Sequence, residues 1–423
     1  MFNYAIKKFP TGLRLLMVPS KESLSFQIMV LVNTGSDFET KRINGISHFL
    51  EHMCFKGTKK RPSNLIITKE LDQVGGSYNA FTSREKTGYY ARVAKDFKEL
   101  AIDIVADIYI NSQFPEKEIE KEKGVILEEI SMYKDLPPKL IWDLWEQLLY
   151  GNQPAGWSIL GPEKNIKRFK RKNFLNYFNQ QYKSRSTIVV TSGNFSQQEI
   201  VKLVEKYFGN IRKGKGNKKP ITKQKQKKPE ILLEYRKTDQ THLILGVRSY
   251  NLFNKKIYPL IVLDAILDGG MSSYLWQLIR EKLGAAYYAF SDVERFTDRG
   301  YWAVAAGIDN DRLELVLKEI LKEWKKLKKE YLIKDNLKKA KDYIKGKIAL
   351  QTENVHNVAS IFASQLLLEN RIETLKEYLA KINKVTLKDL SVVANELLKT
   401  QNLNLALIGP FKNKERLLKL LKI

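Results

Sequence analysis

The pattern of apolar and polar positions predicts a chain that mixes strands and helices. The first twenty residues alternate between the two kinds, which is typical of a strand pair, joined here at a Pro-Thr-Gly turn. Later segments adopt the three-to-four-residue spacing of amphipathic helices. The elements expected in this half are helices at 44–56, 66–74, 95–150 and 197–207, with strands at 86–93 and 186–196.

The second half of the chain repeats this outline. It opens with two strands, continues with two helices separated by glycines, returns to two strands, and ends with long helices and an apolar strand. The expected ranges are 230–235, 241–247, 257–267, 272–282, 285–291, 301–307, 311–400 and 402–410. Because strands and helices do not alternate strictly, this order favours α+β architecture over a parallel sheet. We therefore predict two α+β domains of similar plan, related by internal duplication.

A lysine-rich segment separates the two halves. Residues 212–229 contain eight lysines, two glycines and two prolines, with almost no apolar side chains. Such a composition cannot join a hydrophobic core and is typical of a solvated linker. The expected organisation is a first domain at 1–212, a basic linker at 213–229 and a second domain at 230–423.

Composition narrows the class of protein. A single cysteine, Cys54, excludes an internal disulfide and a cysteine-built zinc site, and it suits a reducing compartment. No run of 18 apolar residues is present, so we expect a cytoplasmic protein without membrane insertion. The net charge is +26, and most of the excess positive side chains are lysines spread along helix faces. Clusters of arginine and aromatic residues, on which nucleic-acid bases stack, are missing. We therefore expect no specific nucleic-acid partner, although charge alone would attract polyanions.

The segment HFLEH, residues 48–52, carries the candidate chemistry. On a helix, His48 and His52 differ in direction by about 40°, so two imidazoles can hold one zinc ion between them. Glu51 lies on the same arc without having to be a ligand. The motif is short enough to occur by chance on an amphipathic helix, and catalytic zinc requires a third protein ligand. The remaining histidines have no partner at ligand spacing and are expected to be structural: His242 and His356.

A second acidic helix, residues 116–135, offers that third ligand. Its apolar stripe, predicted to face inward, consists of Val125, Ile126, Ile130 and Tyr133. Glu129 lies inside this stripe, whereas Glu128 points about 100° away. A carboxylate on a buried face is costly unless a partner offsets it, and a zinc ion would do so. Glu122 lies on the same face and could hold a ligand in place.

These two segments together resemble the M16 (pitrilysin, inverzincin) peptidase family, especially the subunits of mitochondrial processing peptidase and their bacterial relatives. The family pattern is HxxEH, then 76 residues, then Glu; here 76 residues separate His52 from Glu129. The resemblance implies that His48, His52 and Glu129 bind one zinc ion per chain. It also implies that Glu51 is the general base and that Glu122 supports the ligands.

Other stretches of the first half carry the same resemblance. The segment GGSYNAFTSREKTGYY, residues 75–90, is similar to the NAxTSRE segment of the family. In the family this segment forms an edge strand that pairs with extended substrate, which implies substrate contacts for Asn79 and Phe81. The stretches at 11–19, 32–40 and 159–166 also resemble family segments.

The second half has one matching segment and no HxxEH. Residues 268–288, DGGMSSYLWQLIREKLGAAYY, resemble GGxxSSRLFxxLREKxGLAYS of the family. The resemblance implies that Arg280 and Tyr287 contact substrate. This chain departs from the pattern at Tyr274, where arginine is usual, and at residues 285–286, which are Ala-Ala where Leu-Ala is usual.

Taken as a whole, the resemblance implies a zinc-dependent endopeptidase that cleaves extended peptides or unfolded protein segments. It implies two similar domains, each a mainly antiparallel β-sheet packed with helices. Long family members carry four such domains on one chain, so a two-domain chain implies a homodimer that encloses the substrate. The alternative is a non-catalytic subunit of a heteromeric complex, but such subunits usually lose part of the HxxEH–Glu set.

Overall fold

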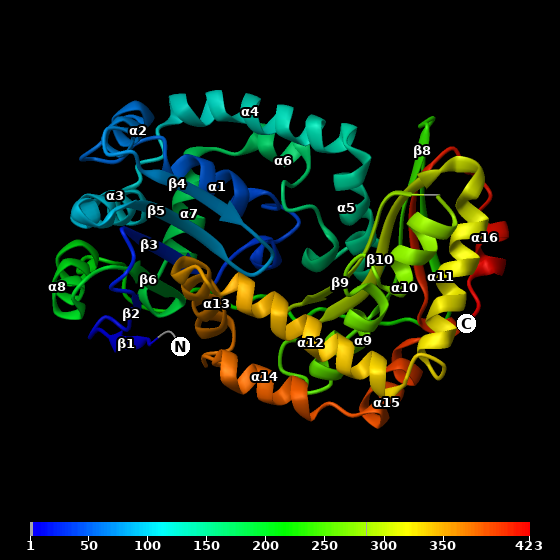
Figure 1. Cartoon of the computed structure of the whole chain (residues 1–423). Coiled ribbons are helices and arrows are strands. Elements are labelled where there is room, and N and C mark those ends of the chain that lie inside the picture. Colours follow the sequence, from blue (N-terminus) through cyan, green and yellow to red (C-terminus); the bar gives the residue numbers. More distant parts are fainter. Residues whose placement is uncertain (1–2, 285) are drawn as a thin grey trace. The chain divides into compact units, whose positions relative to one another are not determined.

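The computed structural model describes residues 3–284 and 286–423, which form two compact units (Figure 1). The first contains the chain up to Ser131, Trp157–Pro220 and Gln351–Ile372; the second contains Met132–Gly156, Ile221–Leu350 and Glu373–Ile423. Both units combine a sheet with packed helices, so the predicted α+β class is confirmed. No helix among the described residues has the length and hydrophobicity needed to cross a membrane.

The first unit is built on a six-stranded sheet in the order β1-β2-β6-β3-β5-β4. Its strands are β1 (Ala5–Lys8), β2 (Arg14–Pro19), β3 (Ser25–Val32), β4 (Ser77–Thr82), β5 (Thr87–Ala94) and β6 (Thr187–Gly193). Only the β2–β6 pair in this order is parallel. The central strands β3 and β6 are buried on both faces because helices cover both sides. β4 lies at one edge of the sheet.

The helices of the first unit cover the two faces of this sheet. They are α1 (Ile46–Cys54), α2 (Asn64–Asp72), α3 (Lys98–Asn111), α4 (Glu116–Asp135), α6 (Glu163–Arg168), α7 (Arg171–Gln181), α8 (Gln197–Phe208) and α13 (Val355–Leu368). α3 packs on β3 and β5, and α1 packs beside β4. α13 covers the other face, where Phe362 joins a core with Leu16 and Val190.

The second unit has a five-stranded sheet in the order β7-β11-β8-β10-β9. Its strands are β7 (Glu230–Tyr235), β8 (Gln240–Arg248), β9 (Ala286–Arg295), β10 (Gly300–Asp309) and β11 (Asn404–Gly409). Its helices are α5 (Pro137–Tyr150), α9 (Ile257–Asp268), α10 (Tyr274–Trp276), α11 (Leu313–Leu327), α12 (Lys334–Gln351), α14 (Leu375–Lys384), α15 (Leu387–Leu397) and α16 (Lys414–Leu420). The largest core cluster lies between this sheet and α9, α11 and α15.

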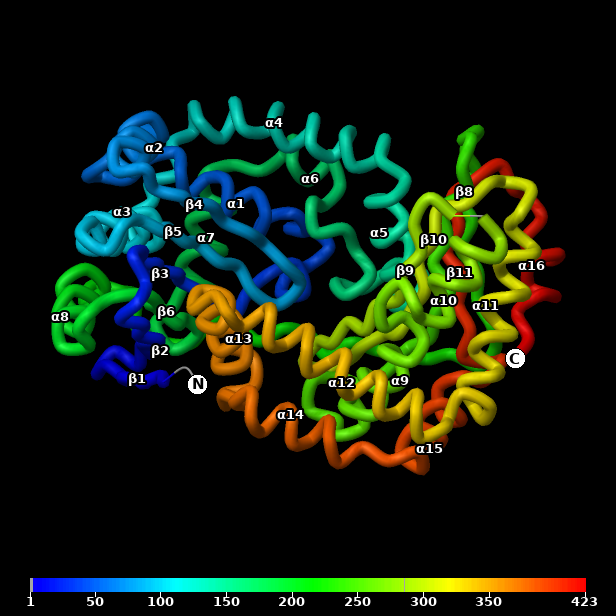
Figure 2. Tube along the Cα trace, in the orientation of Figure 1, coloured from blue at the N-terminus to red at the C-terminus, as the bar shows by residue number. Residues whose placement is uncertain are grey.

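The two sheets share one topology. In each, the first strand of the matching set pairs in parallel with the last (β2 with β6, β7 with β11), and the other pairs are antiparallel. The predicted duplication is therefore visible in the strand order. Along the tube of Figure 2, the chain enters the second unit with α5 and returns to the first with α6, α7 and α8. It leaves again at Ile221, returns once more with α13, and ends in the second unit.

The units are not the two continuous stretches expected from the sequence. α5 precedes the linker but buries Trp145 against the second sheet, and α13 follows the linker but packs on the first sheet. The expected domains 1–212 and 230–423 therefore each give one helix to the other unit. An apolar helix face predicts that the helix is buried, but it does not predict which sheet covers it. The sequence therefore could not show that α5 and α13 belong to the opposite units.

The basic linker is bound to the protein surface and is not the free tether expected. The described residues 213–229 include no helix or strand. Lys219 Nζ lies 2.6 Å from Glu85 Oε1 and 3.5 Å from Asp37 Oδ2, and both carboxylates are almost fully buried. The Thr222 amide donates to Asp298 Oδ2 at 2.8 Å. At least one linker lysine thus neutralises buried charge.

Candidate metal site

Helix α1 presents the HFLEH segment because its other face is fully buried. The apolar positions of that face are Ile46, Phe49, Leu50 and Met53. The helix begins after Gly45, whose φ of +98° favours glycine and whose Cβ would lie 2.6 Å from Leu160 O. Glu39 caps this end, since its carboxylate accepts hydrogen bonds from the amides of Gly45 and Ser47, each at 2.8 Å. The orientation of His48, Glu51 and His52 is therefore set by packing and capping.

Helix α4 presents the third candidate ligand. Its buried positions are Ile119, Glu122, Ile126 and Ile130. Glu129 is half-buried beside this stripe and Glu128 is exposed, as predicted. The prediction was wrong for Val125, which is 52% exposed. Val125 lies about 100° from Ile126 around the helix axis, beyond Glu129, so it falls outside a stripe centred on Ile126.

The side chains of His48, His52 and Glu129 converge. One ligand atom from each lies within 4.8 Å of the others, and this is the one such group of potential metal ligands in the described part of the chain. Glu129 Oε2 lies 3.5 Å from His48 Nε2 and 3.7 Å from His52 Nε2. Tetrahedral coordination with bonds of about 2.0–2.2 Å would place ligand atoms about 3.3–3.6 Å apart. Two imidazoles and a carboxylate at these distances fit a single divalent ion of the zinc type.

The two histidines differ in protonation. Burial, and secondarily the nearby His52, lowers the pKa of His48 to about 3, so this imidazole is neutral. His52 Nδ1 lies 2.9 Å from Glu122 Oε1. Because an ionised carboxylate only accepts hydrogen bonds, His52 donates from Nδ1. Burial lowers the pKa of His52, but this bond and the neighbouring carboxylates raise it overall. A metal ion bound at Nε2, which faces Glu129, would therefore displace a proton. Glu122 thus holds His52 as predicted from its place on the α4 face.

Glu51 lies beside the cluster with a perturbed carboxyl group. Burial is the main cause that raises the pKa of Glu51, opposed by a hydrogen bond from Thr82 and by His52. A carboxylate whose pKa moves upward toward neutrality is suited to accept and return a proton. Thr82 was missed in the sequence, although it lies on the β4 face that packs beside α1. The alternation of strand side chains was the available signal.

The two β4 residues predicted to contact substrate lie on the opposite sheet face. Phe81 packs against the core under α13 and over Gly88, so its side chain does not reach the metal cluster. Asn79 is exposed, and its Oδ1 accepts the Ala80 amide at 2.8 Å. β4 itself is an edge strand, so its outer backbone groups have no strand partner among the described residues. Any role of Asn79 and Phe81 toward an extended peptide would therefore run through this backbone edge.

Arg280 and Tyr287 lie in the second unit, and both are exposed. The helix expected at 272–282 is a short α10 followed by a π-helical stretch, Gln277–Lys282, a backbone form that is frequent at functional sites. The guanidinium of Arg280 lies 4.8 Å from the ring centroid of Trp276. Tyr287, near the start of β9, is 60% exposed. Ala285, one of the departures from the family pattern, lies outside the described residues.

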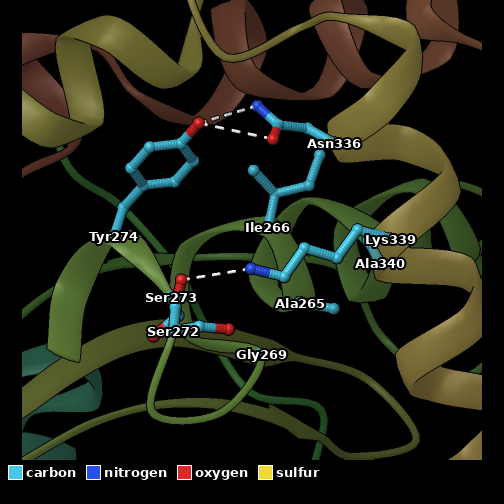
Figure 3. Close-up of a pocket in the computed structure, with 9 residues that line it drawn as sticks. All are labelled: Ala265, Ile266, Gly269, Ser272, Ser273, Tyr274, Asn336, Lys339 and Ala340. Atoms are coloured by element: carbon cyan, nitrogen blue, oxygen red, sulfur yellow. Dashed lines mark hydrogen bonds between the residues drawn. The ribbon is translucent and has the colours of Figure 1, made fainter. Parts of the chain in front are cut away.

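Tyr274, the other departure, anchors the start of this segment to α12 (Figure 3). Its ring stacks on Tyr331 with centroids 3.6 Å apart, and its hydroxyl accepts a hydrogen bond from Asn336 Nδ2 at 2.9 Å. Lys339 Nζ donates to Ser272 O at 3.1 Å. These contacts border a small cavity of about 140 Å³ lined by Ala265, Ile266, Gly269, Ser272, Ser273, Tyr274, Asn336, Lys339 and Ala340.

The remaining histidines and the cysteine have structural surroundings, as expected. His356 bridges two serine hydroxyls, Ser25 and Ser192, each at 2.8 Å. His242 Nδ1 lies 3.0 Å from Tyr288 OH. Cys54 is fully buried, and burial raises the pKa of its thiol to about 12.

Comparison with known proteins finds family profiles and relatives that match most of the chain. The profile described as insulinase (peptidase family M16) matches residues 16–163, and that of the peptidase M16 inactive domain matches residues 168–344. An uncharacterized zinc protease of Bacillus subtilis (strain 168) is 36% identical over 405 residues, covering 95% of this chain and 97% of its own. An uncharacterized zinc protease of Rickettsia bellii is 33% identical over 410 residues, covering 96% and 98%.

Solved structures show the same fold. A protease from Helicobacter pylori superposes with a TM-score of 0.89 at 24% identity, covering 97% of this chain and all of that one. A peptidase M16 inactive domain from Pseudomonas fluorescens gives 0.88 at 18% identity, covering 98% of this chain. These likenesses concern the fold alone. The family profiles and the sequence relatives above establish that the chain belongs to peptidase family M16.

Proposed function

We propose that the protein is a zinc-dependent endopeptidase that hydrolyses extended peptides or unfolded protein segments. The observation that carries this proposal is the convergence of His48, His52 and Glu129 on one point, with Glu51 beside it. Membership of family M16 supports it, as do the relatives named as zinc proteases. The fully buried single cysteine suits the cytoplasm, where we place the activity.

Each candidate residue would have a separate role in peptide hydrolysis. His48, His52 and Glu129 would hold one zinc ion, which supplies a water of lowered pKa and polarises the scissile carbonyl. Glu51 takes a proton from the attacking water and returns it to the leaving amine. The outer edge of β4 pairs with the peptide by strand addition, which reads backbone more than sequence. Arg280 and Tyr287 contact the peptide from a second-unit surface.

The direct test is metal analysis of the purified protein together with cleavage of an unstructured peptide. We expect about one zinc ion per chain, because one three-ligand group is present in the described residues. Chelation should stop cleavage, and added zinc should restore it. Metal-free protein that cleaves peptides, or zinc-loaded protein that cleaves none of a broad peptide mixture, would contradict the proposal.

Glu129→Gln should weaken zinc binding far more than Glu128→Gln. The amide removes the negative charge from the ligand position, where Glu129 Oε2 faces both histidines. Glu128 is exposed on the same helix and serves as the matched control. Titration of the metal-free proteins with zinc measures both affinities. The reverse ranking would show that the register of α4 at the site is wrong by one residue.

We also propose that two copies of the chain form the working enzyme. The chain has two domains of the family type, whereas long members are expected to place four on one chain. It carries both the metal-binding group and the Arg280–Tyr287 pair, so two copies can complete each other. A symmetric dimer would then supply each site with Arg280 and Tyr287 from its partner.

Mixing two inactive variants tests this arrangement. A Glu51→Gln chain and an Arg280→Ala chain form mixed dimers in which one of two sites has both an intact base and an intact arginine. With free exchange half of the dimers are mixed, so about a quarter of wild-type activity should return. Each variant alone is the control. A monomer at the working concentration, or no recovery despite proven exchange, would refute the shared site.

A further inference from the structure

Lys56 follows the HFLEH helix and contacts the carboxylate that holds His52. Its Nζ lies 2.6 Å from Glu122 Oε2, while Glu122 Oε1 lies 2.9 Å from His52 Nδ1. The two oxygens of one carboxylate are therefore divided between the ammonium and the imidazole. The Glu122 side chain is 6% exposed, so neither contact is a solvated surface pair. Lys56, Glu122 and His52 form one chain of contacts leading to the metal site.

The local backbone fixes where Lys56 points. Its amide donates to Met53 O at 3.1 Å in the turn that ends α1. Gly57 follows with a φ of +133°, and a Cβ there would lie 2.8 Å from Pro62 O, so this tight turn requires glycine. The Gln113 amide then donates to Gly57 O at 3.1 Å, which joins the turn to the segment before α4. Lys56 is thereby placed against α4 by structure on both sides of it.

The other basic residues of this segment point elsewhere. Lys59 is exposed, Lys60 pairs with Asp103 at a largely exposed position, and Arg61 is buried among Glu70, Asp103 and Asp107. Lys56, with a side chain 22% exposed, is the member of the run that contacts Glu122. If Lys56 were only one of the surface charges of this basic chain, its surroundings would resemble those of Lys60. Lys56 is instead largely buried against Glu122, whereas Lys60 is largely exposed.

The physical need for Lys56 follows from the burial of Glu122. An ionised carboxylate taken out of water is costly with one imidazole as its partner, and an adjacent ammonium offsets that cost. A carboxylate held in this way stays a strong acceptor for His52 Nδ1–H, which fixes the ring and directs Nε2 toward Glu129.

We propose that Lys56 is a positioning residue for the metal site, acting on His52 only through Glu122. This inference rests on the proposed zinc-binding function. Neither the HxxEH motif nor the 76-residue spacing to Glu129 includes Lys56, so the sequence pattern alone does not give this lysine a function.

The test is a coupled measurement of zinc affinity on metal-free protein, by competition with a chelating dye. Lys56→Met keeps the apolar stem, removes the charge and should weaken zinc binding by about 10-fold or more, as outer partners of metal ligands typically do. Lys56→Arg keeps the charge and should retain most of the affinity. Lys60→Met, which also breaks a lysine–carboxylate pair, should match the wild type.

The double variant distinguishes positioning from general support of the fold. Lys56→Met should have little further effect on zinc affinity in a Glu122→Gln background, because its route to His52 is already removed. The double variant leaves neither the ammonium nor the carboxylate of this pair, so it remains available if Lys56→Met alone fails to fold. Zinc binding by Lys56→Met at wild-type affinity, or equal losses from Lys56→Met in both backgrounds, would overturn the inference. Wild-type protein that binds no zinc would instead defeat the proposed function, and this inference with it.

Discussion

Glu51→Gln should keep the zinc content of the wild type and cleave peptides about 10²–10⁴-fold more slowly, the range that general acid–base catalysis typically contributes. Glutamine matches the size of the side chain but cannot take the proton from the attacking water. Because burial already raises the pKa of Glu51 and disfavours its charge, a neutral amide is tolerated at this position. The ligands are left in place, so metal binding should persist.

Two measurements on the same preparation separate the outcomes for Glu51. Metal analysis shows whether the site is still loaded, and the cleavage rate shows whether the base is missing. Glu128→Gln removes a carboxylate from an exposed position near the site and should leave both unchanged. If Glu51→Gln cleaves peptides within a few-fold of the wild-type rate, Glu51 is not the general base. Loss of zinc from this variant would mean that Glu51 acts on the metal itself.

The candidate ligands could be predicted because their signals are local or depend on a fixed spacing. His48 and His52 are one helical turn apart, and no tertiary information is needed to place them together. Glu129 was selected over Glu128 by its position on an apolar helix face and by the 76-residue spacing that the family resemblance supplied. The structure brings all three side chains together.

The residues that sequence reasoning missed act through contacts between segments far apart in the chain. Lys56 meets Glu122, Thr82 meets Glu51, and Lys219 meets Glu85. Nothing in the pattern around a lysine or threonine tells which distant carboxylate it will approach. The same limit applies to α5 and α13, whose apolar faces predict burial but not the sheet that they cover.

Periodicity also has a resolution limit, which Val125 shows. An apolar residue at the border of a buried helix stripe has about the same sequence neighbours whether its side chain is buried or exposed. Phe81 shows a second limit, because the motif that implied a substrate contact does not give the direction of a side chain, which packs here against the core under α13. In both cases the direction of a side chain followed from the element's geometry rather than from the residue type.

His48→Ala and His52→Ala should each abolish stoichiometric zinc binding. Zinc sites in proteins are worth about 10–16 kcal/mol shared among a few ligands. Losing one of three ligands therefore costs on the order of 3–5 kcal/mol, or about 10²–10⁴-fold in affinity at 1.4 kcal/mol per tenfold. The two variants reach this loss by different routes. His48→Ala empties a buried position on α1, whereas His52→Ala also leaves Glu122 with Lys56 as its remaining partner at the site.

His242→Asn is the matched control for the two ligand variants. It changes another buried histidine, whose ring contacts Tyr288 and lies in the second unit. Zinc per chain, measured on folded protein after removal of loosely bound metal, should stay near one for this control and fall far below one for His48→Ala and His52→Ala. Wild-type zinc in either ligand variant would show that the metal is held elsewhere. Loss of zinc from the control alone would indicate that His242 is a metal ligand. An ion held by His48, His52 and Glu129 should not depend on His242.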